Sequence, residues 1–207
     1  FAETCPQYLY LTVEDTLAKP DFEGAKWVCS PPIRSAHDDH PHHADLWKGL
    51  RTNDLAIVST DHCPFCFKDQ KELGRGDFSK IPNGLPGVGD RLPVFWTKGV
   101  GSGKITPEEF VRLNATNPAK IFGLYPQKGS LKPGADADIL LWDPDLEVKY
   151  GVGTAQHRTD YNLYEGWALK GMPQTVYLRG ERIVHKGQWL GKAGGGQILK
   201  RNSGEIL

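Results

Sequence analysis

Three things are scarce in this sequence: net charge, long apolar runs and methionine. Its 207 residues hold 25 Lys and Arg against 25 Asp and Glu, so the formal net charge is zero. A neutral chain gives no argument for nucleic acid or an anionic membrane as partner, and we predict neither. No apolar run approaches the roughly 20 residues that a membrane-spanning helix needs. The composition is that of an ordinary soluble globular protein.

Methionine occurs once, at Met172, and the sequence opens with Phe1 directly into a Glu-Thr-Cys run. A chain that began at its own start codon would carry Met at that end. We therefore expect residues 1–207 to be the C-terminal part of a longer protein. The length is enough for one large domain or two small ones.

Cysteine is also infrequent, with four residues at Cys5, Cys29, Cys63 and Cys66. The last two form a Cys-Pro-Phe-Cys run, which has the bare spacing of a metal-binding or redox pair. A zinc site would need a second pair or suitably spaced histidines. We expect instead reduced thiols, buried or in loops, in a cytoplasmic protein.

Helices are predicted before residue 125 from apolar spacing and from capping residues. Leu46, Trp47 and Leu50 recur at helical spacing. A capping threonine opens the run Thr106–Glu109, followed by proline in the first turn and glutamate three residues after the cap. Similar reasoning predicts helices at Thr12–Leu17, Ala44–Arg51, Leu92–Val100 and Asn117–Phe122.

Short strands are predicted mainly at the start of the chain and after Tyr125. The expected strands or extended runs are Phe1–Cys5, Lys26–Cys29, Leu55–Val58, Ala137–Trp142, Thr175–Leu178 and Arg182–His185, the last two as a hairpin around Gly180-Glu181. Residues 62–90 form a long polar connection, a kind of loop that is usually functional in a compact domain. The sequence thus predicts an α/β region followed by a small β region.

Asp61 follows the apolar stretch Leu55–Val58 within the run Ser59-Thr60-Asp61-His62-Cys63. In a parallel barrel, catalytic and metal-binding groups lie at the C-terminal ends of the strands. A carboxylate there could bind a metal through one oxygen and accept a proton through the other. The alternative, from residue type alone, is a cap or turn aspartate.

Eight short runs together carry a family resemblance. They are Glu3–Tyr8, Ser30–Arg34, Asp61–Phe65, Lys71–Arg75, Ile81–Gly84, Leu124–Gly129, Gly134–Ile139 and Asp160–Gly166. In this order they resemble the dihydropyrimidinase and D-hydantoinase family of the cyclic amidohydrolases, over nearly the whole chain. One run alone would be modest evidence for the family, whereas all eight runs in the same order are strong evidence.

The resemblance implies a fold and an activity. Residues 1–124 would be the last strands and helices of a (β/α)8 amidohydrolase barrel, and residues 125–207 would be part of a small β-sandwich and a C-terminal tail. The reaction would be metal-dependent hydrolysis of dihydropyrimidines or hydantoins to N-carbamoyl amino acids. We expect residues 1–207 alone to be inactive, because most barrel strands and metal ligands would lie upstream.

The resemblance also assigns roles to three residues. Asp61 would be a metal ligand and the proton shuttle, whereas Ser30 and Asn83 would hold the cyclic imide through main-chain groups. Their alternatives are a strand-end cap and a turn residue. Two divalent metal ions are implied, with zinc expected, and a carboxylated lysine and histidines upstream would be the other ligands. His62 would orient the site or serve only in packing.

Other polar clusters receive weaker interpretations. The run His37–His43 could bind metal adventitiously, but we expect a surface loop. Arg75, Asp90 and Arg91 are expected in surface or structural ion pairs. The glycine-rich run Gly84–Gly89 lacks the Lys-Ser/Thr of a phosphate loop, so we reject nucleotide binding.

Two other functions remain open. Allantoinase or dihydroorotase activity fits the 71–75 and 81–84 runs less well. A non-catalytic dihydropyrimidinase-like interaction protein would share the fold, but such proteins typically lack the aspartate that this chain has at Asp61; a β-rich interaction module is a further alternative. By analogy, the full-length protein would be a homotetramer, with the tail Trp189–Leu207 reaching a neighbouring subunit.

Overall fold

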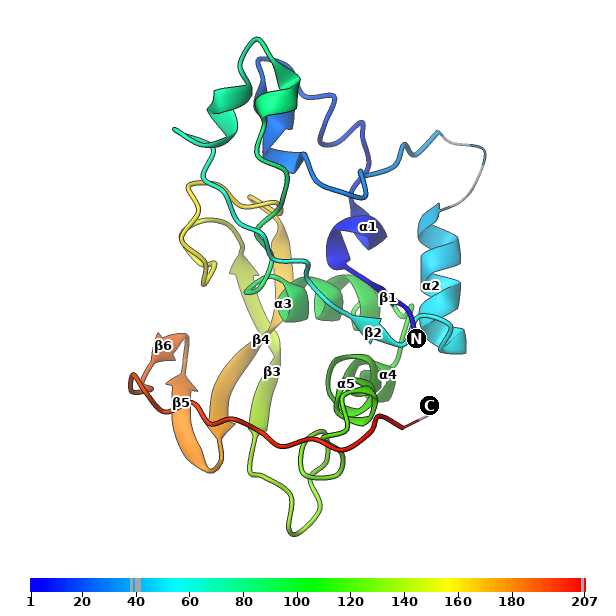
Figure 1. Ribbon diagram of the computed structural model, residues 1–207, viewed down its shortest axis with the longest axis vertical. Coiled ribbons are helices and arrows are strands. Elements are labelled where there is room, and N and C mark those ends of the chain that lie inside the picture. The colour runs from blue at the N-terminus through cyan, green and yellow to red at the C-terminus, as the bar shows by residue number, and fades with distance from the viewer. Residues whose placement is uncertain (38, 40–41, 206) are drawn as a thin grey trace. The chain divides into compact units, whose positions relative to one another are not determined.

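The computed structural model describes residues 1–37, 39, 42–205 and 207 (Figure 1). Its helices are α1 (Pro6–Tyr10), η1 (Glu23–Trp27), α2 (His42–Thr52), η2 (Lys71–Gly74), η3 (Phe78–Lys80), α3 (Arg91–Phe95), η4 (Trp96–Val100), α4 (Pro107–Val111), η5 (Arg112–Thr116) and α5 (Asn117–Ile121). Its strands are β1 (Glu3–Thr4), β2 (Ile57–Val58), β3 (Ile139–Lys149), β4 (Ala168–Leu178), β5 (Glu181–His185) and β6 (Gln188–Trp189).

These elements group into two compact units. The first consists of Phe1–Phe95 with Val148–Leu169, and the second of Trp96–Glu147 with Lys170–Leu207. The units are described separately below. The assignment of residues 1–124 to a barrel and 125–207 to a sandwich concerns the longer protein, and it stays a prediction.

A parallel strand pair lies at the centre of the first unit. Strand β1 pairs with β2 in the register Glu3↔Ile57 and Thr4↔Val58 (Figure 1). Hydrogen bonds extend the pairing at both ends, because Ala56 donates to the Ala2 carbonyl and Ser59 to the Thr4 carbonyl, each at 2.8 Å. Val58 is fully buried. The predicted strands at both places are therefore confirmed, and they lie side by side.

The core of the first unit forms where α1, α2 and α3 meet. Trp47 of α2 stacks on Phe95 of α3 with ring centroids 5.6 Å apart, and Tyr10 of α1 packs on the same Trp47 at 5.8 Å. Leu50, one turn further along α2, is fully buried. The apolar spacing that predicted this helix is the spacing that buries its inner face.

Two local predictions in the first unit are wrong. Residues 13–18 form turns instead of a helix, because the Thr16 hydroxyl bonds to the Thr12 carbonyl at 2.5 Å and the Thr12 hydroxyl to Asp15 at 2.9 Å. Such side-chain bonds compete with helix formation. Lys26 and Trp27 belong to the 3-10 helix η1 rather than to an extended run, which begins only at Val28.

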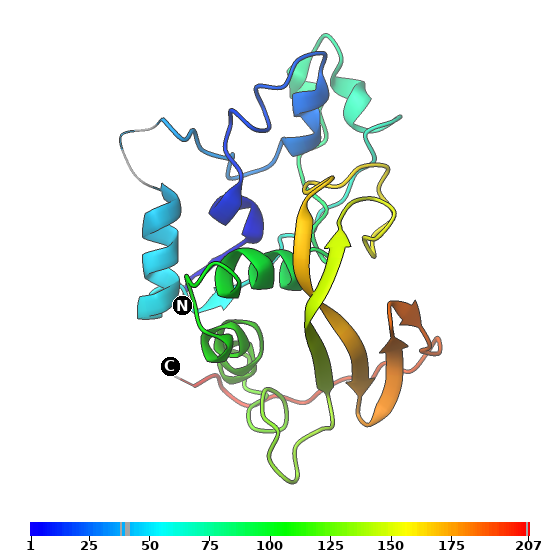
Figure 2. The same ribbon diagram turned by 180° about the vertical axis from the view of Figure 1, so that it is seen from behind.

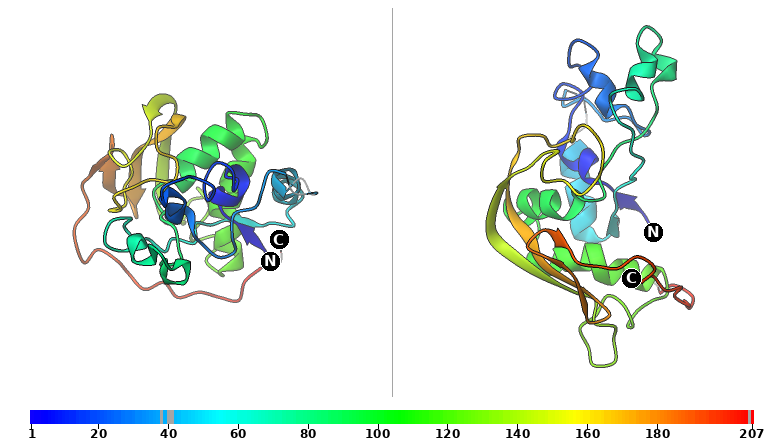
Figure 3. Two further views of the ribbon diagram at one scale, coloured as in Figure 1. Left: turned by 90° about the horizontal axis from the view of Figure 1, so that it is seen from above. Right: turned by 90° about the vertical axis from the view of Figure 1, so that its left-hand side faces the viewer.

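The long connection 62–90 is confirmed as a loop without long elements. It contains the short helices η2 and η3, and η2 lies beside η1 (Figure 3). Its start is held by main-chain bonds from Phe67 and Lys68 to the Asp160 carboxylate, at 2.6 and 2.9 Å. The loop is therefore anchored to a segment almost a hundred residues away in the sequence.

The helices between residues 91 and 121 follow the predicted starts in part. Thr106 and Glu109 form the expected capping box, with Thr106 N–H donating to Glu109 at 2.8 Å. The helix predicted at Leu92–Val100 is confirmed, with a π-helical second half. Asn117, in contrast, is helical itself (φ −61°, ψ −47°) and does not begin a separate helix. Its N–H bonds to the Arg112 carbonyl five residues back, so the π-helical turn carries the helix through to Pro118.

The sheet has the strand order β3-β4-β5-β6. The predicted hairpin is confirmed with antiparallel pairs from Thr175↔His185 to Leu178↔Glu181 (Figure 2). Its turn is Arg179–Gly180, one residue earlier than expected, and both residues have positive φ, as a type I′ turn requires.

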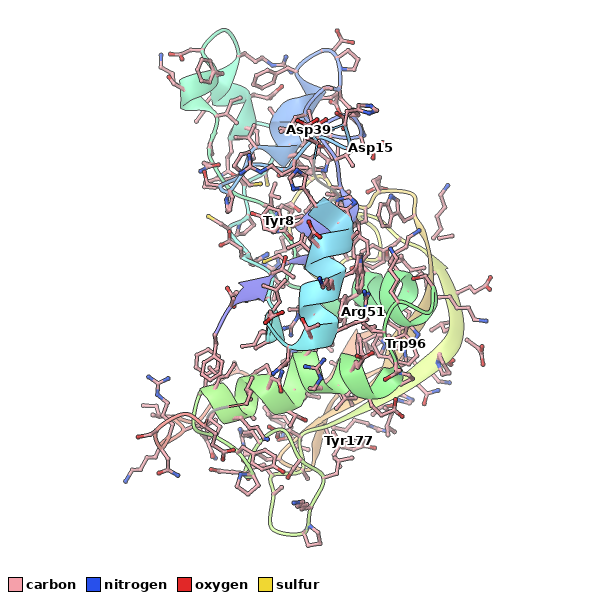
Figure 4. The ribbon with its side chains drawn as sticks, turned by 90° about the vertical axis from the view of Figure 1, so that its right-hand side faces the viewer. Tyr8, Asp15, Asp39, Arg51, Trp96 and Tyr177 are labelled. Atoms are coloured by element: carbon pink, nitrogen blue, oxygen red, sulfur yellow. The ribbon has the colours of Figure 1, made fainter. Side chains whose placement is uncertain are left out.

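Aromatic side chains fill the space beside this sheet. Trp96, labelled in Figure 4, packs edge-on against Phe110 at 5.2 Å and against Trp142 at 5.3 Å. Gly171 of β4 lies against both tryptophans, and a Cβ there would approach Trp96 to 2.2 Å. A glycine is needed for this contact. Within the described part of the chain, no helix has the length and apolar character to cross a membrane.

Candidate active site

Asp61 lies just beyond the carboxyl end of β2, as the strand pattern predicts. Its side chain is exposed, and its backbone has φ 47°, a left-handed conformation that aspartate tolerates better than most residues. The strand end before it is fixed by side chains. Arg91 donates to the Val58 carbonyl at 2.8 Å, and the Gln7 amide donates to the Thr60 carbonyl at 3.4 Å. The fold thus holds a carboxylate out at the end of a buried parallel strand.

Ser30 and Asn83 lie together although 53 residues separate them. The Asn83 side-chain amide donates to the Ser30 hydroxyl at 2.9 Å, and both residues are exposed. The Gly84 N–H donates to the Val28 carbonyl at 3.1 Å, so the main chains of the two segments are joined as well. These two predicted substrate-contact residues form a single surface feature.

A hollow of about 1170 Å³ opens beside Asp61 in the first unit. Cys5, Tyr8 and Pro31 are among its lining residues, and the Tyr8 hydroxyl donates to the Pro31 carbonyl at 3.0 Å. Tyr8 is labelled in Figure 4. Pro31 follows Ser30 directly, so the hollow reaches from Asp61 to the edge of the Ser30 segment. Ser30 and Asn83 themselves do not line it, and no hydrogen bond joins either residue to Asp61 within the described chain.

His62 holds the loop that follows the site. Its Nδ1 accepts the N–H groups of Gly87 at 3.0 Å and Val88 at 3.2 Å, so the ring is neutral there and carries its proton on Nε2. Burial lowers the pKa of His62, and the neighbouring His157 lowers it further. A structural role of His62 is therefore evident in these two bonds.

Asp90 is a buried structural group, one of the two alternatives expected for it. Asp90 is 1% exposed, and its Oδ1 accepts from the Tyr150 hydroxyl at 2.8 Å and from the Asn162 amide at 3.1 Å. Burial raises the pKa of Asp90, although His157 and the two hydrogen bonds oppose this effect. Arg75, in contrast, forms an ordinary exposed pair with Glu72 at 2.8 Å. Of the two expected alternatives, a surface or a structural pair, Arg75 takes the first, whereas Asp90 is buried 3.7 Å from the His157 ring and takes the second.

The burial and the hydrogen bonds of Lys71 were not predicted from the sequence. It is fully buried, and its ammonium donates to the carbonyls of Val28, Pro82 and Gly84 at 3.0, 2.6 and 2.9 Å. No pattern among the residues indicated this beyond the presence of Lys71 in one of the family-like runs. Main-chain acceptors cannot be read from residue types, because every residue carries one.

The residues that the structure describes do not provide a complete set of metal ligands. Among the residues that the structure describes, no group of three or more His, Cys, Asp or Glu side chains could hold an ion. A catalytic zinc needs about three protein ligands. Asp61 has the chemistry and placement of one ligand, so the residues present fit a share of a metal centre and not a whole one. Within the predicted His37–His43 loop, Asp38, His40 and Pro41 lie outside the described residues.

All four cysteines are free thiols, as expected. Cys5 and Cys29 are buried, Cys66 is half-buried and Cys63 is exposed. The Cys5 thiol lies 3.2 Å from the Ser59 hydroxyl, and burial raises its pKa to about 11. A thiol with such a pKa is protonated and unreactive at neutral pH.

Comparison with known proteins identifies close relatives. The model of the amidohydrolase family matches residues 32–183. D-hydantoinase of Streptomyces coelicolor is 50% identical over all 207 residues, and D-hydantoinase of Ralstonia pickettii is 50% identical over 200 residues, or 97% of this chain. The solved structure of D-hydantoinase from a Bacillus sp. AR9 superposes with a TM-score of 0.94 at 45% identity and covers 100% of this chain. The chain spans 42–44% of the lengths of these relatives.

Proposed function

Because the chain belongs to the amidohydrolase family, we propose that it is part of a hydrolase that opens cyclic amide rings. The substrates would be hydantoins or dihydropyrimidines, and the products N-carbamoyl amino acids. One observation carries the proposal: half of all residues are identical to a D-hydantoinase along the entire chain. The fold class predicted from the sequence, the end of a (β/α)8 barrel with sandwich strands, agrees with the superposition on a hydantoinase.

Asp61 would act as metal ligand and proton carrier. Two divalent ions, which we propose to be zinc, would supply the polarisation that makes water nucleophilic and stabilises charge on the carbonyl oxygen. One Asp61 oxygen would hold an ion, while the other takes the proton from the attacking water and passes it to the leaving ring nitrogen. The exposed carboxylate at the strand end supports this role. The other ligands, including a carboxylated lysine, would come from outside these 207 residues.

Ser30 and Asn83 would bind the ring of the substrate. A cyclic imide presents N–H and C=O groups at fixed positions, and main-chain groups of the opposite kind can pair with them. The hydrogen bond between the two side chains supports a shared role, since it keeps both segments at one place. Their exposure leaves the main chain open to a small ligand.

The assembly and location are proposals as well. We propose that the full-length protein is a cytoplasmic homotetramer. The full-length protein here means residues 1–207 together with a part that corresponds to the rest of its relatives' length. Free thiols support a reducing compartment. The tail leaves Trp189 66% exposed and Ile198 fully exposed, and such apolar groups are suited to cover by a neighbouring subunit.

The test is hydrolysis of hydantoin and dihydrouracil by the full-length protein, with bound metal measured on the same sample. Ring opening that stops on chelation and returns with added zinc supports the proposal. A protein that binds no metal and opens neither ring contradicts it, and the non-catalytic interaction protein becomes the better interpretation.

A further inference from the structure

Lys71 is an ammonium group placed inside the protein without a carboxylate. It lies on η2, is fully buried, and makes no ion pair in the described part of the chain. Burying an unpaired charge is costly unless its donors are satisfied. Here the three N–H donors meet three carbonyl oxygens, those of Val28, Pro82 and Gly84, at 2.6–3.0 Å.

These three carbonyls surround the two proposed substrate-contact residues. Val28 is two residues before Ser30, whereas Pro82 and Gly84 flank Asn83 on either side. One side chain thereby ties together two segments that lie more than fifty residues apart. Burial lowers the pKa of Lys71 to about 8, with the Cys29 and Cys63 thiols opposing the effect. The group therefore carries its proton, and all three donors, at neutral pH.

Peptide geometry links Lys71 to the direction of the Asn83 main chain. The Pro82 carbonyl and the Asn83 N–H belong to one planar trans peptide, so they point in opposite directions. Since the carbonyl points to Lys71, the Asn83 N–H points away from it.

The peptide after Asn83 is oriented in the same sense. Its Gly84 N–H donates to the Val28 carbonyl, which Lys71 also holds, so the Asn83 C=O must point the other way. Both main-chain groups of Asn83 thus face away from the lysine, as a donor beside an acceptor. Within the described residues neither has a hydrogen-bond partner. This is the pattern that the N–H and C=O of a cyclic amide can pair with.

We propose that Lys71 is a positioning residue that aims the main-chain groups of Asn83, and holds the Ser30 segment, for binding the substrate ring. This inference rests on the proposed function, because it takes Asn83 as a substrate contact. The lysine itself touches no substrate. Its ammonium replaces the water that would otherwise solvate three inward-facing carbonyls and let the two segments move apart.

The test compares Lys71→Met with Lys80→Met in the full-length protein. Met keeps most of the volume of Lys71 and removes all three donors, whereas Lys80 is an exposed lysine of the same connection, paired with Asp77 at 3.3 Å. We expect KM for hydantoin to rise 10- to 100-fold in Lys71→Met, with a smaller fall in kcat and unchanged metal content. Lys80→Met should match wild type.

The outcomes separate the inference from the function beneath it. An inactive wild-type protein would overturn the proposed function. An active wild type with an unchanged KM in Lys71→Met would overturn only the role of Lys71, as would equal losses in kcat and metal, which indicate general damage. If Lys71→Met does not fold, Lys71→Gln, which keeps two amide donors, takes its place. Its KM for hydantoin should also rise, with a smaller fall in kcat and unchanged metal content, and an unchanged KM would overturn the role of Lys71.

Discussion

Removing the Asp90 carboxylate by Asp90→Ala should destabilise the segment 148–165, whereas removing only its charge by Asp90→Asn should not. Asp90→Ala removes the nearest acceptor of two buried donors, the Tyr150 hydroxyl and the Asn162 amide, which now lie 2.8 and 3.1 Å from Oδ1. It leaves them only longer contacts of 3.3 Å, to the Gly89 carbonyl and to the His157 ring. Both partners are at most 4% exposed, so bulk water does not reach them while the segment is folded. Asp90→Asn keeps an oxygen at the same place.

The magnitude follows from these two donors. A buried donor that loses its acceptor costs about 1–3 kcal/mol. Because each donor keeps a longer contact at 3.3 Å, Asp90→Ala should lower the free energy of local opening by about 2–4 kcal/mol. Asp90→Asn should cost about 1 kcal/mol or less, because its amide oxygen can accept both bonds and no charge stays buried.

Hydrogen exchange of the full-length protein measures this difference. Since about 1.4 kcal/mol is a factor of ten, amides in 148–165 should exchange roughly 30- to 10³-fold faster in Asp90→Ala and less than tenfold faster in Asp90→Asn. Equal effects of both substitutions, or no effect of alanine, would refute the reasoning.

The pH dependence has a defined sign. Burial raises the pKa of Asp90 in the folded state, so above the unfolded value the folded protein holds more protons than the unfolded one. The stability that wild-type Asp90 contributes, relative to Asp90→Asn, should therefore fall as pH rises from the unfolded pKa through the raised folded pKa. A growing advantage of wild type over the same range would contradict the assigned direction.

Three further predictions concern separate parts of the chain. Thr106→Ala removes the acceptor for the Glu109 N–H and should cost about 1 kcal/mol, seen as faster exchange at the start of α4, while Thr106→Ser should stay near wild type. A thiol reagent at neutral pH should modify the exposed Cys63 well before the buried Cys5, whose pKa is raised to about 11, and equal rates would show that the first unit is open. Residues 1–207 alone should neither hydrolyse hydantoin nor retain two ions per chain, because we assign one metal-ligand position, Asp61, among the described residues; measurable turnover would refute this.

Patterns confined to neighbouring residues were readable from the sequence. Apolar spacing located α2, because apolar residues three or four positions apart lie on one face of a helix, and Trp47 and Leu50 on that face are buried. The Thr106 capping box and the hairpin at Gly180 were equally local. The turn at residues 13–18 was missed because hydroxyl and carboxylate bonds of Thr12, Asp15 and Thr16 replaced helical ones.

Groups whose partners lie far along the chain were not readable. Lys71 and Asp90 look like surface charges in the sequence, yet one meets carbonyls of two distant segments and the other meets Tyr150 and Asn162. Asp61 was singled out only because a buried strand precedes it and a family motif contains it. Its placement at the strand end agrees with that expectation, whereas its metal and proton roles remain proposals.

The most direct test of the account is Asp61→Asn in the full-length protein, with metal content measured alongside hydrolysis of hydantoin and dihydrouracil. Asparagine keeps one oxygen for the ion but cannot carry the proton. We predict that kcat falls by roughly 10²- to 10⁴-fold while most of the metal is retained. Activity within a few fold of wild type would contradict the role of Asp61 and the account built on it.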